Sequence, residues 1–156
     1  METTSEAFKI SLQKLKSLCS LREYCSSEIE AKIRPWNLSP EEKQAMIHIL
    51  KEDGFMDDLR YAKAFTHDKL QFNQWGPVKI SFSLRSKGIG EETILLAIHQ
   101  IEKKLWMEVL QNILEKKKKT TSANSNYEMK AKLFRYASGK GFDFDHIEKA
   151  MQKGGL

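Results

Sequence analysis

Two adjacent carboxylates, Asp57 and Asp58, have the most obvious chemical potential in this 156-residue chain. Neighbouring carboxylates can bind a divalent cation or share a proton. Adjacent residues of a helix, however, point about 100° apart, and acidic residues are favoured in the first helical turn. We therefore interpret the pair as a helix cap. A hydrolase that uses both aspartates is the competing hypothesis, and it predicts that activity is lost when either becomes asparagine.

Histidines and cysteines show no spacing typical of catalysis or metal binding. The four histidines are scattered along the chain, at His48, His67, His99 and His146. Cys19 and Cys25 lie six residues apart without a second pair, so we expect reduced structural thiols and no zinc. A glycine-rich phosphate loop is also absent from the sequence. We therefore expect no catalytic residue, metal or cofactor, and predict that the protein is not an enzyme.

Positive charge is concentrated in the last two-thirds of the chain. Residues 1–59 carry 8 Lys/Arg and 11 Asp/Glu (net −3), residues 60–104 carry 8 and 4 (+4), and residues 105–156 carry 10 and 6 (+4). The region from residue 60 onward therefore carries a net charge of +8. Such a field attracts anions, and we expect the anion to be nucleic acid or an acidic protein groove. A basic surface that merely keeps the protein soluble remains the alternative.

The basic residues fall into two candidate groups for binding anions. Arg60, Lys63 and His67 are spaced i, i+3 and i+7, which places them on one helical face. The full set of candidates is Arg60, Lys63, Lys79, Arg85 and Lys87 in the middle of the chain, and Lys130, Lys132, Arg135 and Lys140 near its end. An ordinary solvated helix face is the alternative interpretation. The run Lys116–Lys119 is interpreted as a linker rather than a site, and the aromatic residues are assigned mainly to packing, with Trp75 as a plug between neighbouring units.

Helical start and stop signals recur throughout the sequence, and glycine and proline together number only 11. Ser26 and Ser27 can cap one helix, and Ser39-Pro40-Glu41-Glu42 forms a capping box for the next. Further helices are expected to begin at Asp57, Pro77 and Gly90, and the inward residues include Phe72 and Leu105. Between 91 and 119 the pattern fits two helices or one long bent helix equally well. The polar residues 116–126 are expected to form a flexible connection before a final helix pair.

An internal repeat with a period of about 51 to 53 residues runs through the chain. The matching apolar triplets are Ile29, Ile33 and Leu38; Ile80, Leu84 and Ile89; and Leu133, Ala137 and Phe142. Each repeat is expected to contain three short helices, with limits at 1–56, 57–104 and 105–156. Tandem units of this size bury each other's apolar faces. We therefore predict an all-α protein: three helix-turn-helix-like repeats in an elongated, curved array whose concave side offers a binding surface.

Several motifs resemble the RecX family of recombinase regulators. They are Asp57-Asp58-Leu59-Arg60-Tyr61-Ala62, Gly76-Pro77-Val78-Lys79-Ile80, Leu84-Arg85-Ser86-Lys87-Gly88-Ile89, Leu21-Arg22-Glu23-Tyr24-Cys25-Ser26 with Glu28-Ile29 and Lys32-Ile33, and Lys132-Leu133 with Lys140-Gly141-Phe142. The resemblance implies an all-helical, three-repeat modulator that binds the RecA filament, usually inhibits its ATPase and strand exchange, and often binds DNA. Ser138-Gly139-Lys140 departs from the more basic stretch that many members carry there.

We accordingly expect a monomeric, cytoplasmic regulator with two partners, the RecA filament and non-specifically bound single- or double-stranded DNA. The longest apolar run, Ile94–Ile98, is too short to span a membrane, and Met1–Leu15 contains Glu2 and Glu6 but no apolar signal segment. A stand-alone DNA-binding protein with helix-turn-helix-like units is the principal alternative. Segment 91–104, with Glu91 and Glu92, offers few of the side chains that read base edges.

Overall fold

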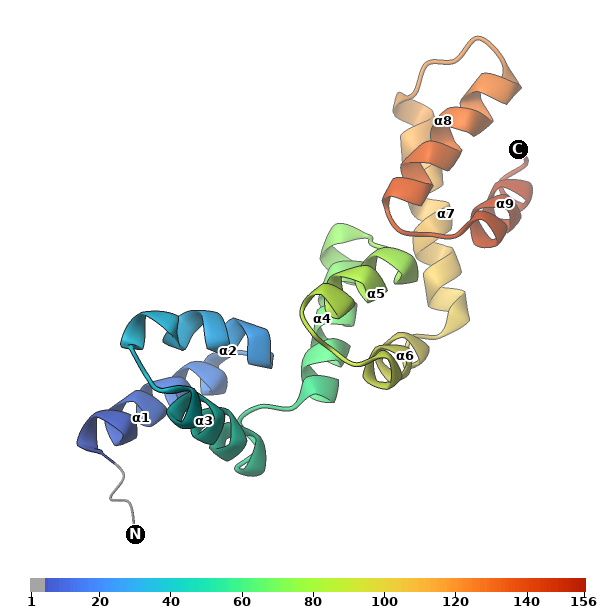
Figure 1. Cartoon of the computed structure of the whole chain (residues 1–156). Coiled ribbons are helices and arrows are strands. Elements are labelled where there is room, and N and C mark those ends of the chain that lie inside the picture. Colours follow the sequence, from blue (N-terminus) through green and yellow to red (C-terminus); the bar gives the residue numbers. More distant parts are fainter. Residues whose placement is uncertain (1–4) are drawn as a thin grey trace.

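The computed structural model describes residues 5–156, and this range is helical with no strand. Following the chain, the elements are α1 (Glu6–Leu21), α2 (Ser26–Ile33), a short 3-10 turn η1 (Arg34–Trp36), α3 (Pro40–Glu52), α4 (Asp58–Asn73), α5 (Pro77–Ser86), α6 (Glu91–His99), α7 (Lys103–Thr120), α8 (Asn126–Gly139) and α9 (Phe144–Lys153). We call α1–α3 unit 1, α4–α6 unit 2 and α7–α9 unit 3. Figure 1 shows the units in an elongated row with the chain ends at opposite extremes, which confirms the predicted all-α tandem array.

Side-chain caps fix where most of the helices begin. The Ser39 hydroxyl accepts a hydrogen bond from Glu42 N at 3.1 Å, while the Glu42 carboxylate accepts one from Ser39 N, as the predicted capping box requires. Asp57 caps α4 by accepting from Arg60 N at 2.8 Å. The prediction for α2 was wrong by one residue, because Cys25 occupies the cap position and its N–H is held by Glu28.

The same turn joins the second and third helices of every unit. Asn37, Gly88 and Gly141 all have left-handed backbone, with φ of 51°, 83° and 98°. The next residue in each case is apolar and the one after it caps the following helix; these pairs are Leu38 and Ser39, Ile89 and Gly90, and Phe142 and Asp143. In units 2 and 3 the N–H groups of this turn donate to the last carbonyls of the preceding helix. In all three units the apolar side chain packs against a hydrophobic cluster. The three sequence repeats therefore share the same turn structure.

The segment between 91 and 119 consists of two helices. α6 ends at His99, and α7 begins at Lys103 after Glu102 has adopted extended backbone with φ −63° and ψ 139°. Ile101, in the break, is buried at 4 % exposure, so burial of this side chain accompanies the change in chain direction without glycine or proline. The predicted limit at 104/105 lies inside α7, and the limit at 56/57 lies just before α4; both domain limits stay predictions.

The lysine run belongs to α7 and not to a linker, which corrects the expected connection at 116–126. Lys116–Lys119 occupy the last turns of a helix that ends at Thr120. Lysines at a helix C-terminus interact favourably with the unpaired carbonyl groups there, so polar composition does not terminate the helix. The connection between α7 and α8 is therefore limited to residues 121–125.

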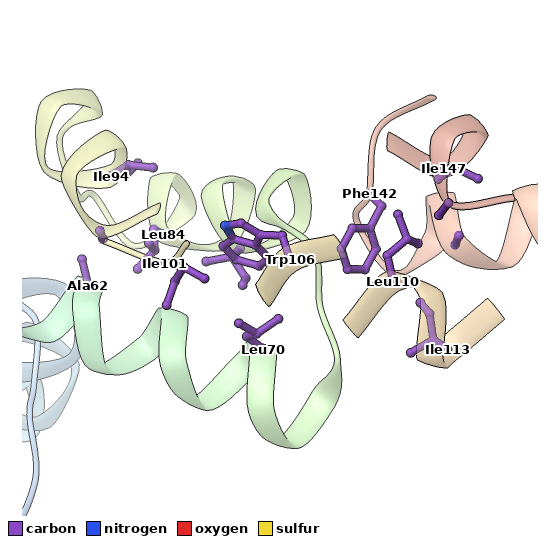
Figure 2. Packing of buried hydrophobic residues seen from close by; sticks show 14 of the residues in the cluster. Ala62, Leu70, Leu84, Ile94, Ile101, Trp106, Leu110, Ile113, Phe142 and Ile147 are labelled. Atoms are coloured by element: carbon purple, nitrogen blue, oxygen red, sulfur yellow. The ribbon is translucent and has the colours of Figure 1, made fainter. Parts of the chain in front are cut away.

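Two hydrophobic clusters divide the molecule. The smaller one lies in unit 1 and includes Leu15, Ile29, Met46 and Leu50. The larger one runs without a break through units 2 and 3. In Figure 2, Trp106 lies between the unit 2 side chains Leu70 and Ile101 and the unit 3 side chains Leu110 and Phe142.

Phe72 and Leu105, which were expected to face inward, lie outside the core: Phe72 is 71 % exposed and Leu105 is 40 % exposed. Trp75, the expected plug, is only partly buried against the larger cluster, whereas Trp106 is buried within it. Among residues 5–156, no helix is long and apolar enough to cross a membrane. Glu2, one of the two acidic residues cited against a signal segment, lies outside the described residues.

Candidate functional site

The junction of units 1 and 2 is held by Arg60, the first of the predicted binding residues. Its Nε donates to Glu23 Oε1 at 2.6 Å, and its Nη2 donates to the Gly54 carbonyl at 2.9 Å. The hydrogen bond to Glu23 raises the pKa of Arg60, and the nearby carboxylates of Glu23 and Asp57 add to this effect. Arg60 is thus engaged in a contact between units, while Lys63, one turn further along α4, is exposed.

The junction of units 2 and 3 brings two other candidates together. Lys79 Nζ lies 3.4 Å from the Gly139 carbonyl and 4.5 Å from the centre of the Trp75 ring. In the reverse direction, Lys140 Nζ donates to the Asn73 carbonyl at 3.0 Å. Both ammonium groups therefore connect neighbouring units, although part of each side chain still faces solvent.

Several of the remaining candidates already have partners within their own unit. Arg85 forms an exposed ion pair with Glu91, whose hydrogen bonds raise the pKa of the guanidinium and lower that of the carboxyl group. Lys132 contacts Glu128 at 3.1 Å and donates to the Ser122 carbonyl at 2.7 Å. Lys87 lies 5.8 Å from the centre of the Phe65 ring.

Lys63, Lys130 and Arg135 are exposed, and no ion pair involves them in the described part of the chain. The nine candidates are therefore spread over both inter-unit junctions and the outer faces of units 2 and 3. Their role in binding stays a prediction.

The aspartate pair lies at the start of α4, as the capping interpretation predicts. Asp57 is the cap, and one oxygen of Asp58, Oδ1, is buried without a hydrogen-bond partner among the described residues. Residues 5–156 contain no group of three His, Cys, Asp or Glu side chains that could hold a metal ion.

A groove of about 700 Å³ lies between units 2 and 3, close to several of the basic residues. We call it the inter-unit groove; α4, α7 and α8 supply its lining, which is His67, Leu70, Gln71, Gln74, Leu105, Val109, Asn112, Ile113, Lys116, Lys117, Thr120 and Tyr136. This lining contains no aspartate or glutamate. The ammonium group of Lys117 lies 4.8 Å from the centre of the Tyr136 ring.

Lys116 and Lys117 are the residues that the sequence interpretation left out of the candidate site. Their assignment to a linker removed them, yet the apolar pattern at Leu110, Ile113 and Leu114 continues into the lysine run without a glycine or proline. Extending that periodicity by two turns places Lys116 on the same face as Val109 and Asn112. The signal was therefore present in the sequence.

Comparisons with known proteins place these units in one family. The protein-family model described as "RecX, second three-helix domain" matches residues 57–98, and the family model "RecX, third three-helix domain" matches residues 107–151. These ranges correspond closely to units 2 and 3. The chain also superposes on the crystal structure of RecX from Lactobacillus salivarius with a TM-score of 0.87 over 96 % of this chain and 97 % of that one, at 21 % identity, a likeness that shows the fold.

Curated relatives point to the same family. "Regulatory protein RecX" from Legionella pneumophila (strain Corby) is 29 % identical over 136 residues, covering 87 % of this chain and 89 % of the relative. The protein of the same name from Halalkalibacterium halodurans is 33 % identical over 105 residues, or 67 % of this chain and 40 % of the relative. The chain spans about half the length of several such relatives, including one from Clostridium botulinum at 50 %. These matches agree with the shared turn and the three-unit array, and the chain belongs to the RecX family of regulatory proteins.

Proposed function

We propose that this protein regulates a RecA recombinase by binding the RecA–DNA filament and lowering its ATPase and strand-exchange activities. The observation that carries the proposal is the match of units 2 and 3 to RecX domains, together with relatives named regulatory protein RecX. The protein acts without catalysis or a cofactor, as a cytoplasmic monomer in homologous recombination, DNA repair and the SOS response.

The proposed mechanism is steric and electrostatic. An elongated row of units can contact more than one recombinase protomer along a helical filament, which hinders ATP turnover or blocks the path of the incoming duplex (Figure 1). The net charge of +8 from residue 60 onward attracts the anionic filament. Bound protein then shifts the balance of filament assembly toward loss of subunits.

The test is DNA-dependent ATP hydrolysis by the cognate RecA, titrated with this protein at two salt concentrations. Direct binding of the protein to DNA without RecA is measured in parallel. We expect inhibition at protein concentrations well below those that coat the DNA. Unchanged ATPase and strand exchange at stoichiometric protein would contradict the proposal.

The same titration separates the proposal from the principal alternative, a stand-alone DNA-binding protein. Competition for DNA predicts inhibition only when the DNA is saturated, and predicts that rising salt abolishes it. Footprinting adds a second criterion, because a sequence-specific reader protects a defined site whereas a filament regulator does not.

Charge reversal tests which cations matter in this function. We expect Arg60→Glu, Lys63→Glu and Lys79→Glu together to reduce inhibition more than Lys117→Glu with Lys118→Glu. Because Arg60 and Lys79 also connect units, a urea titration must show that the triple variant is folded. Equal loss from the α7 changes would contradict the assignment of recombinase binding to the middle of the chain.

A further inference from the structure

The inter-unit groove combines two lysines with a lining that holds no carboxylate. Arg60, Arg85 and Lys132 have carboxylate partners, whereas no ion pair involves Lys116 or Lys117 in the described chain. The groove lining itself holds no carboxylate. A neighbouring hollow on the other side of α7 is lined by Lys118 and Lys119 but also by Glu115. Lys116 and Lys117 are therefore available to an external anion, as the exposed Lys63, Lys130 and Arg135 are, and the groove adds a hollow around them.

The two groove lysines are held on a well-defined helical turn. The hydroxyls of Thr120 and Thr121 both donate to the Lys117 carbonyl, at 3.2 and 2.6 Å, and so satisfy an acceptor at the end of α7. Lys117 is also placed over the Tyr136 ring from α8. A cation that is positioned before binding, as Lys117 is, loses less side-chain entropy when it meets a phosphate.

The rest of the groove suits the non-phosphate part of a nucleic acid. The apolar part of its lining, which we call the floor, includes Leu105 and Val109 from α7 and Leu70 from α4. Amide groups also line the groove, and an amide can both donate to and accept from a base edge. The amide side chains are Gln71, Gln74 and Asn112.

We infer that the inter-unit groove binds a segment of single-stranded nucleic acid, with backbone phosphates at Lys116 and Lys117 and bases over the apolar floor. A single strand is favoured over a duplex because only unpaired bases can turn their faces and Watson–Crick edges toward the protein. The inference rests on the proposed function, since the filament supplies the nucleic acid. It goes further by assigning the groove of α4, α7 and α8 to the nucleic acid and leaving other surfaces for the recombinase.

The lysine run provides a matched pair of variants. Lys116→Gln/Lys117→Gln removes two charges from the groove, and Lys118→Gln/Lys119→Gln removes two charges from the neighbouring hollow on the same helix. Binding of a fluorescent oligothymidylate of about 15 nucleotides is measured by anisotropy. At each salt concentration between roughly 50 and 200 mM, we expect the groove pair to bind at least about tenfold more weakly than the unmodified protein. The slope of log binding constant against log salt concentration should become shallower by about 1.4. The control pair is expected to weaken binding less than about twofold.

A second variant tests the opposite wall of the groove without touching a lysine. Gln71→Glu places a carboxylate on α4 beside the proposed strand, and Gln13→Glu makes the same change on α1 in unit 1. We expect only Gln71→Glu to weaken binding of the oligothymidylate. Equal urea midpoints for all variants establish that the fold is retained.

Three results would overturn the inference. Equal losses from the two lysine pairs would mean that total charge alone governs binding. Stronger groove-dependent binding of polyglutamate than of oligothymidylate would mean an acidic polypeptide site. Absence of oligothymidylate binding by the unmodified protein, with inhibition of RecA intact, would reject the groove but keep the proposed function. Binding through the groove with no effect on RecA would support the inference and reject the proposed function.

Discussion

At the scale of single residues, two glycines decide how closely units 2 and 3 approach. Gly76 N donates to the Lys140 carbonyl at 2.7 Å, and Val78 N donates to the Gly141 carbonyl at 2.9 Å. A Cβ atom on Gly76 would overlap the Gly141 carbonyl and lie 2.8 Å from Phe142 Cγ. Gly141 also has φ of +98°, a backbone conformation that other residues rarely adopt. The inter-unit contact therefore depends on two positions without side chains.

Gly76→Ala is expected to lower the free energy of unfolding by about 1–3 kcal/mol, because the added methyl group meets backbone atoms that cannot move independently. Urea denaturation measures the change. Gly139→Ala is the control, since its Cβ would have open space in the helical backbone of α8, and we expect it to stabilise the protein by about 0.5–1 kcal/mol. Equal stability of the two variants would contradict the close approach of the units.

Glu28 caps the start of α2 and also interacts with basic residues of units 1 and 2. Burial raises the pKa of Glu28, but the hydrogen bond from Cys25 N and the charges of Arg22 and Lys87 more than offset this, so the pKa lies below its ordinary value of 4.5. The folded state thus favours the carboxylate more strongly than the unfolded chain does. Its stabilising contribution is present above about pH 4.5 and is lost as the pH falls through the lowered pKa.

Glu28→Gln is expected to cost about 1 kcal/mol at neutral pH, a magnitude typical of a lost helix cap. The variant should also lose less stability than the unmodified protein when the pH falls below about 4.5. Urea midpoints at neutral and acidic pH provide the measurement. Glu30→Gln, on the exposed side of the same helix, is the control. An acid-induced loss that is identical in Glu28→Gln and the unmodified protein would contradict the assigned role.

At the scale of elements, α7 contributes both to the core and to the inter-unit groove. Its N-terminal half places Trp106 and Leu110 in the core shared by units 2 and 3, and its last turns supply Lys116 and Lys117 to the inter-unit groove. One helix therefore connects the structural junction to the proposed binding surface.

A proline substitution distinguishes this helix from the linker that polar composition suggests. Lys118→Pro is expected to cost about 3 kcal/mol, because it removes an N–H from the helical hydrogen-bond ladder and clashes with the preceding turn. Ala123→Pro, in the connection between α7 and α8, is the control and should have a much smaller effect. Circular dichroism and urea denaturation follow helix content and stability. Similar effects at both positions would mean that the lysine run is not helical in solution.

Local patterns predicted the helices well because their signals are local. The capping box at Ser39 and the turns at Gly88 and Gly141 depend on residues within one or two turns of chain. Phe72 was misassigned because periodicity shows which residues share a helix face but not where the covering helix ends. Its exposure at the end of α4 is a tertiary property.

The candidate site was less accessible to sequence interpretation for a similar reason. The sequence identifies every cation but not its partner, and Arg60 pairs with Glu23, 37 residues earlier. Lys79 and Lys140 meet across a junction of two units. Only the structure shows that Arg60, Lys79 and Lys140 are held by groups of a neighbouring unit, whereas Lys116 and Lys117 are not.

At the scale of the whole molecule, units 2 and 3 share one core while unit 1 has its own. Leu84 and Leu133 belong to the same continuous cluster although they lie in different units. Unit 1 adds only Cys25 to that cluster, and its remaining ties include the hydrogen bonds of Arg60. Tandem repeat proteins derive much of their stability from such interfaces between neighbours.

Hydrogen exchange should therefore resolve two levels of protection. Amides at Leu15 and Leu50 in unit 1 are expected to exchange faster than those at Leu84, Leu110 and Leu133, because a smaller separate core opens at lower free energy. The measurement is native-state exchange followed by NMR. Uniform protection of all five amides would show that the three units open as a single cooperative structure.

The row of units also determines how the molecule behaves hydrodynamically. A compact chain of this length has a radius of gyration of roughly 15 Å, and the extended arrangement in Figure 1 should give a larger value in small-angle X-ray scattering. A value near that of a compact sphere would contradict the extended arrangement.

An elongated particle has more friction than a sphere of equal mass, so gel filtration should overestimate its size and suggest a dimer. Light scattering, which depends on mass, is expected to return the monomer mass of 18.1 kDa.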